Sequence, residues 1–117
     1  MNIATTLWAI GIAFFSLLPA QAAVSTGTWD KLEHSLAYAV LTVLARRARP
    51  KSPQILVGTL CALYGGAIEA AQYLSPGRHP DFFDGVANAL GVLLGLTLYQ
   101  AWLKLRHKMQ AERQDEP

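Results

Sequence analysis

Three long stretches of the 117-residue chain carry no charged side chain. They run from Met1 to Trp29, from Ser52 to Ile68 and from Gly85 to Leu103. A helix rises 1.5 Å per residue, so a bilayer core about 30 Å thick needs roughly 20 apolar residues in succession. The first and last stretches reach that length, and the middle one nearly does. This distribution of charges indicates membrane-crossing helices more clearly than the average composition does, which is 52% hydrophobic and 15% charged.

A fourth, shorter charge-free window runs from Ser35 to Ala45, after a polar start. Helices on the surface of soluble proteins show a polar stripe every 3.6 residues, and the run from Leu93 to Tyr99 shows none. The sequence therefore predicts an all-α, integral membrane four-helix bundle. We expect the helices at about residues 3–20, 31–47, 54–74 and 84–103.

These helices form one transmembrane domain, residues 1–103, followed by a basic and polar cytoplasmic tail, residues 104–117. We expect the end of this tail, from Met109, to be a frayed helix end or disordered. Basic side chains concentrate in two places, the connection from Arg46 to Lys51 and the tail from Lys104. By the positive-inside rule, both the N- and C-termini are then cytoplasmic.

The first helix has a second interpretation. The segment Ala20-Gln21-Ala22 follows an apolar run, as a signal-peptidase site does. Met1-Asn2, however, carries no basic residue, so we expect the helix to be retained. The net charge of +2 gives no reason to expect a nucleic-acid partner. The single cysteine, Cys61, excludes an internal disulfide, and no cofactor is expected.

Polar side chains gather at the predicted outer ends of three helices and in the connection between the last two. They are Asp30, Lys31, His34, Tyr38, Glu69, Gln72, Arg78, Asp84 and Asn88. Spacings of three or four place neighbours such as His34 and Tyr38 on one helix face. A carboxylate inside a membrane helix costs roughly 2.5–3.5 kcal/mol and is usually functional. Glu69 should therefore face the bundle interior and have a partner there, with Lys31, His34, Arg78 and Asn88 as candidates.

Each of these residues also has a structural explanation. Asp30 and Asp84 fit the N-caps of their helices, and Lys31 fits a side chain that snorkels to the headgroups. Tyr38 fits core packing. Small residues such as Gly65, Gly91 and Gly95 let helix backbones approach closely. This close approach serves packing within the bundle and also permits a homodimer.

At these positions the sequence resembles the VanZ-like family of small bacterial membrane proteins. The resemblance covers roughly residues 10–96, with departures at Ser35 and Asp81. Its motifs are Asp30-Lys31-Leu32-Glu33-His34 with Tyr38, Tyr64-Gly65 leading to Glu69-Ala70-Ala71-Gln72, Pro76-Gly77-Arg78, and Asp84 with Asn88, Gly91 and Gly95. The resemblance implies a multi-pass protein of the bacterial cytoplasmic (inner) membrane. The founding member is associated with resistance to the glycopeptide teicoplanin, and other members occur beside envelope polysaccharide and exosortase systems.

The polar residues themselves suggest a pocket for a phosphate-bearing amphiphile at the outer leaflet. Arg78 offers a fork that matches phosphate, and Lys31 offers a point charge. Glu69 and His34 are the candidates for proton exchange with a bound group. The remaining ligand-binding candidates are Gln72, Asp84, Asn88, Asp30 and Tyr38. Partners would be membrane lipids, a lipid-linked cell-wall intermediate or a lipoglycopeptide.

Three other interpretations stay open at this point. The chain shows no clear nucleophile, because Ser75 lacks the elbow motif of serine hydrolases, so enzyme and binder are not distinguished. A non-catalytic envelope protein would use the polar cluster to hold the bundle or to dock a partner. A metal site at Glu69, Asp84, Asp81 and His34 is disfavoured, because the spacing matches no metal motif. Ion translocation is disfavoured as well, because the inner half of the helices is apolar.

Overall fold

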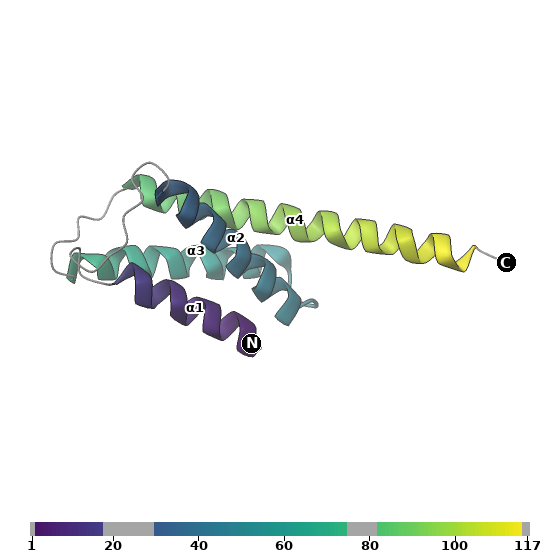
Figure 1. The fold of residues 1–117 in the computed structure, drawn as a ribbon, viewed down its shortest axis with the longest axis horizontal. Helices are drawn as coiled ribbons and strands as arrows, with labels where there is room; N and C mark the ends of the chain where they lie inside the picture. The colour runs from purple at the N-terminus through teal and green to yellow at the C-terminus, as the bar shows by residue number, and fades with distance from the viewer. Residues whose placement is uncertain (1, 18–29, 75–81, 116–117) are drawn as a thin grey trace.

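The computed structural model describes residues 2–17, 30–74 and 82–115, and within these ranges its regular secondary structure is helical, without strands (Figure 1). The all-α prediction is therefore confirmed. The elements are α1 (Ile3–Ser16), α2 (Asp30–Ala48), α3 (Gln54–Ala71), the 3₁₀ turn η2 (Gln72–Leu74) and α4 (Phe82–Gln114).

Local sequence accounts for the helix boundaries. The Asn2 side chain caps α1 by accepting hydrogen bonds from the Thr5 amide and hydroxyl at 2.9 and 2.8 Å. The chain between α2 and α3 contains Pro50 and Pro53. A residue before proline avoids the helical region, and proline cannot donate a backbone hydrogen bond. These two prolines therefore end α2 and set the start of α3 close to where the sequence predicts them.

The fourth helix is longer than predicted. It begins at Phe82 and continues to Gln114, well past the expected end near residue 103. The expected frayed or disordered end from Met109 is wrong as far as Gln114. Residues 104–114 contain no glycine or proline and consist mostly of strong helix formers, so nothing interrupts the helix. The length of the apolar stretch determines how much of α4 can cross a membrane, but the helix itself continues beyond that stretch.

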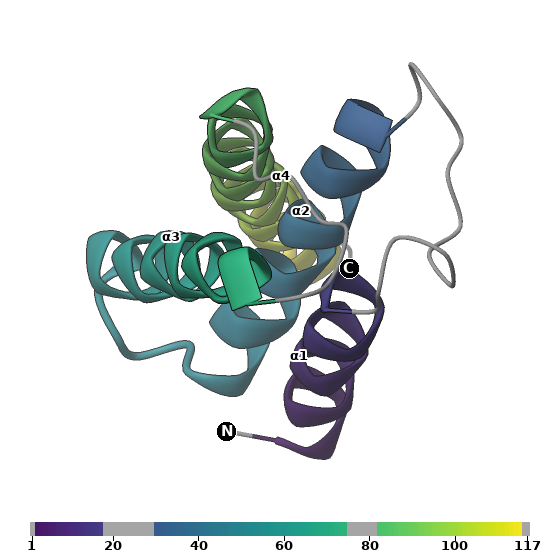
Figure 2. The same ribbon diagram turned by 90° about the vertical axis from the view of Figure 1, so that its left-hand side faces the viewer.

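Helix α2 occupies the centre and contacts each of the other three helices, as the end-on view in Figure 2 shows. Its contact with α4 is close because of two glycines. A Cβ atom at Gly91 would collide with the backbone of Ser35, and one at Gly95 would lie 2.6 Å from the Ala39 carbonyl oxygen. The expectation that Gly91 and Gly95 permit close backbone approach is confirmed, and the contact is made within the chain.

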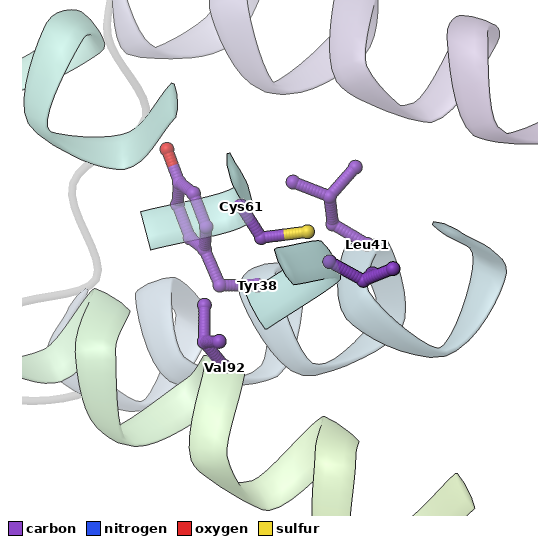
Figure 3. Packing of buried hydrophobic residues seen from close by; sticks show 5 residues of the cluster. Tyr38, Leu41, Cys61 and Val92 are labelled. Carbon is purple, nitrogen blue, oxygen red and sulfur yellow. The ribbon is translucent and has the colours of Figure 1, made fainter. Parts of the chain in front are cut away.

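A small apolar core lies between α2, α3 and α4 (Figure 3). Its buried side chains are Tyr38, Leu41, Val57, Cys61 and Val92. Polar side chains are buried beside it, namely Thr5, Thr42, Arg46, Gln72 and Asn88. Many large apolar side chains face outward instead, including Ile3, Leu63 and Leu90. Exposed apolar surface of this extent is unusual for a soluble monomer.

Two segments are long and apolar enough to cross a membrane by length and composition, Gln54–Leu74 and Phe82–Gln114. Helix α1 is apolar but has only 14 residues, about 21 Å at 1.5 Å per residue. Helix α2 carries charged side chains in its first and last turns, such as Lys31 and Arg46, which lower its mean hydropathy. Of the four helices predicted to cross the membrane, two, α3 with η2 and α4, are thus long and apolar enough to do so.

Candidate functional site

The ends of α1 and α3 and the starts of α2 and α4 lie toward one end of the molecule (Figure 1). We call it the polar end and define it by Ser16, Lys31, Gln72 and Asp84. The opposite end carries the α2–α3 connection, from Arg49 to Pro53, and the part of α4 from Lys104 onward. We call this the basic end.

An ion pair joins α2 to α4 at the polar end. The Lys31 ammonium nitrogen lies 2.7 Å from an Asp84 carboxylate oxygen. The Asp84 side chain is 13% exposed and that of Lys31 is 43% exposed. One turn deeper, the Ser35 hydroxyl donates to the Ala87 carbonyl at 2.9 Å. Both contacts bridge the two helices whose backbones meet at Gly91.

The position of Asp84 differs from that of an N-cap. Helix α4 begins at Phe82, so Asp84 lies inside the first turn. A carboxylate there is stabilised by the positive end of the helix dipole. The Lys31 ammonium group contacts Asp84 directly, which spacing along one helix did not predict. Asp30 is the first residue of α2.

Tyr38 and Asn88 converge over a glycine of α3. A Cβ atom at Gly65 would lie 3.0 Å from a Tyr38 ring carbon and 3.3 Å from the Asn88 amide nitrogen. The Tyr38 hydroxyl and the Asn88 amide oxygen are buried without a hydrogen-bond partner among the described residues. A buried, unsatisfied polar atom costs about 1–3 kcal/mol. In Figure 3 the Tyr38 hydroxyl points away from the other labelled core side chains.

Glu69 and His34 are half-buried in the same region. The Glu69 carboxylate lies within electrostatic range of the Tyr38 phenol, as does Tyr64. The centres of the two tyrosine rings are 6.5 Å apart. His34 lies one turn before Tyr38 on α2. Glu69, the predicted acid–base candidate, thus contributes to the electrostatic environment of a buried phenol with unsatisfied hydrogen-bonding capacity.

Gln72 has a different environment from the other predicted ligand-binding residues. Its amide nitrogen donates to the Ser16 carbonyl at 2.9 Å and so ties η2 to the end of α1. Tyr64 donates to the Ala9 carbonyl, and Trp8 donates to the Ala37 carbonyl at 2.9 Å. These contacts anchor α1 to α3 and α2. Gln72 is therefore part of the helix packing in this structure.

A shallow groove of about 560 Å³ opens between the starts of α2 and α4. Its lining combines the Lys31 cation with apolar side chains and the Ser35 hydroxyl. The main lining residues are Lys31, Leu32, Ser35, Phe83, Val86 and Leu90. The cation and Phe83 belong to the first turns, whereas Leu90 lies two turns further along α4. The groove thus combines one charged side chain, in the first turn of α2, with a mostly apolar lining.

Several predicted residues lie outside the described structure. Arg78, Asp81 and the side chain of Asp30 are among them. Within the described ranges, no group of three His, Cys, Asp or Glu side chains is placed to hold a metal ion. Sequence reasoning assigned Ser35 no functional role, although Ser35 follows Lys31 by four residues. That spacing places both on the face of α2 that meets α4.

Comparison with known proteins agrees with the sequence motifs. No curated protein and no solved structure matched the chain. A family model described as VanZ/LLP1 matches residues 2–104, which is most of the chain and includes α1, α2, α3 and α4 as far as Lys104. The protein therefore belongs to the VanZ/LLP1 family.

Proposed function

We propose that this protein is a multi-pass protein of the bacterial cytoplasmic membrane that binds a phosphate-bearing amphiphile at its polar end. The groove between α2 and α4 carries the proposal, because its lining joins a cation to apolar side chains. A phospholipid or a lipid-linked cell-wall intermediate has the matching parts, an anionic headgroup and an acyl chain. A lipoglycopeptide also combines a polar head with an acyl chain and is the alternative ligand.

The exposed apolar side chains support the membrane location. They occur on all four helices, for example at Leu7, Leu36, Leu63 and Leu90. In lipid, such side chains face the acyl chains at no cost, whereas polar groups are better placed between helices. The basic connection and the basic α4 extension support a cytoplasmic basic end. The polar end then faces outward.

The headgroup would lie beside Lys31, and the acyl chain would pack against Leu32, Val86 and Leu90. Asp84 already neutralises part of the Lys31 charge, so a second cation strengthens the site. Arg78 is our candidate, since its guanidinium matches phosphate better than an ammonium group does. Glu69 and His34 would act on the bound headgroup if the protein is an enzyme.

The test uses protein in nanodiscs containing a photoactivatable phospholipid. We expect the wild type to be labelled on α2 and α4 beside the groove. Leu90→Trp should fill the groove and reduce this labelling several-fold. Leu98→Trp is the matched control, because Leu98 is exposed on the same helix and does not line the groove. Equal labelling of the two variants would overturn the proposal.

A second candidate function is a non-catalytic accessory protein of an envelope polysaccharide or exosortase system. Contacts between helices favour it, because Lys31, Ser35 and Gln72 each bind another helix. Glu69→Gln separates the two candidates. If the protein is an enzyme, the Glu69→Gln variant should reach the membrane in the normal amount and lose the phenotype. If the role of Glu69 is structural, the amount of variant protein in the membrane should fall.

A further inference from the structure

Arg46, in the last turn of α2, is buried although it carries a permanent charge. The residue is 6% exposed. Its guanidinium lies over the Tyr99 ring of α4, 4.8 Å from the ring centre. One terminal nitrogen, Nη1, donates to the Gln54 amide oxygen of α3 at 3.1 Å. The Nε nitrogen has no hydrogen-bond partner among the described residues.

These contacts leave the charge without an anion. In the described part of the chain, no carboxylate forms an ion pair with Arg46. The carbonyls at the end of α2 and the Tyr99 ring offer only partial negative charge. A buried charge is normally paired, because an isolated one loses its hydration without compensation. The arrangement therefore lacks a strong acceptor beside Nε.

A groove of about 750 Å³ between α3 and α4 is lined at one end by Gln54, the residue to which Arg46 donates. Its end near Gln54 is polar, and its continuation along the helices is mostly apolar. The residues that define this change are Gln54, Gln100, Lys104, Gly58, Ala62 and Leu93. Gln54 belongs to both features, because its side chain accepts from Arg46 and also lines the groove.

We propose that Arg46 binds the phosphate of an anionic phospholipid whose acyl chain lies in the α3–α4 groove. The phosphate oxygens would accept from Nε and Nη2, whose N–H bonds point the same way, while Nη1 keeps its bond to Gln54. Guanidinium and phosphate match in this two-bond geometry. Lys104 would contribute a second cation at the groove entrance. This site lies at the basic end and is separate from the polar-end groove.

The surrounding residues favour a lipid over other occupants. The tyrosine and tryptophan beside the site, Tyr99 and Trp102, are typical of the membrane interface. Basic pockets between helices on the cytoplasmic side bind anionic headgroups. A second copy of the chain is disfavoured, because the basic ends of two copies would repel each other. A free anion would leave the apolar part of the groove unused.

The experiment compares lipid retention by native mass spectrometry after exchange into phosphatidylglycerol or phosphatidylcholine. We expect the wild type to retain phosphatidylglycerol preferentially. Arg46→Gln should weaken this retention by at least about tenfold, since it removes the buried cation. Arg47→Gln is the control, because Arg47 lies in the same turn and is exposed. Equal retention by Arg46→Gln and the wild type would overturn the proposal, as would a wild type without preference.

A second pair of variants leaves Arg46 intact. Ala62→Trp places a large side chain in the groove, whereas Ala67→Trp places the same side chain on α3 outside it. We expect only Ala62→Trp to lose phosphatidylglycerol. If inorganic phosphate competes equally well in both variants and lipid retention is unchanged, the site binds a free anion and the proposal is wrong. Leu90→Trp should remove only lipid bound in the polar-end groove, so adding Arg46→Gln to it should cause the same further loss as Arg46→Gln alone, which separates the two sites.

Discussion

Helix α4 packs against α2 and against α3 in different ways, although both contacts contain small residues. Against α2, the glycines of α4 face Ser35, Ala39 and Thr42, which are small as well. The backbones therefore meet. Against α3, the small residue Gly58 faces the Leu96 side chain, whose Cδ1 lies 2.8 Å from a Cβ built at Gly58. There the helices stay apart and leave the groove.

This difference shows that a stripe of small residues does not by itself bring two helices together. Close approach requires small residues on both faces, because one large side chain is enough to hold the backbones apart. The tight contact fixes the positions of Lys31 and Asp84 at the polar end. The loose contact leaves space for a ligand beside Gln54 at the basic end. The two candidate sites thus follow from two kinds of helix packing.

The largest effect is expected for Gly91→Ala. The new Cβ would collide with the backbone of Ser35, and backbone cannot move aside as a side chain can. Overpacking of this kind costs roughly 3 kcal/mol. We expect the free energy of unfolding, measured by denaturant titration in mixed micelles, to fall by about that amount.

Gly85→Ala is the control for this prediction, because Gly85 lies on the same helix with no atom within 4 Å of a built Cβ. It should keep or slightly raise stability, since alanine favours helix over glycine. Equal stability of the two variants would show that α2 and α4 separate easily.

A smaller effect is expected for Asp84→Asn. The substitution removes the charge that pairs with Lys31 but keeps the shape of the side chain. A partly exposed pair contributes about 1 kcal/mol or less. The free energy of unfolding should fall by that amount. Added salt should lower the free energy of unfolding of the wild type but not that of Asp84→Asn.

Glu33→Gln is the matched control for the ion pair, because Glu33 is exposed on α2. Its effect should be close to zero. A loss from Asp84→Asn larger than that from Gly91→Ala would mean that the ion pair, rather than the backbone contact, holds α2 to α4.

The sequence predicted helix positions well where local signals set them. Pro50 and Pro53 mark the connection between α2 and α3, so those boundaries agree within about two residues. The end of α4 was missed because the prediction followed apolar length, whereas the helix follows the helix-forming residues up to Gln114.

Contacts between helices were harder to predict. The sequence indicates both Lys31 and Asp84 as ligand-binding candidates but does not pair them with each other. Spacing along one helix does not tell which residue of another helix lies opposite. The topology rule treated Arg46 only as a cytoplasmic charge, since arginine is almost never fully buried unless paired. Its burial depends on Gln54 and Tyr99 meeting from two other helices, and no local pattern contains that information.

The smallest effect is expected for Gly58→Ala on α3. The new Cβ would meet the end of the Leu96 side chain, which can rotate into the neighbouring groove. Alanine also gains up to about 1 kcal/mol over glycine in helix propensity. We therefore expect the free energy of unfolding to stay unchanged or to rise slightly. The same glycine-to-alanine change would then cost much on the α2 side of α4 and almost nothing on the α3 side. A loss at Gly58 comparable to that at Gly91 would mean that α3 and α4 are closed against each other, and the groove beside Arg46 would be too tight for an acyl chain.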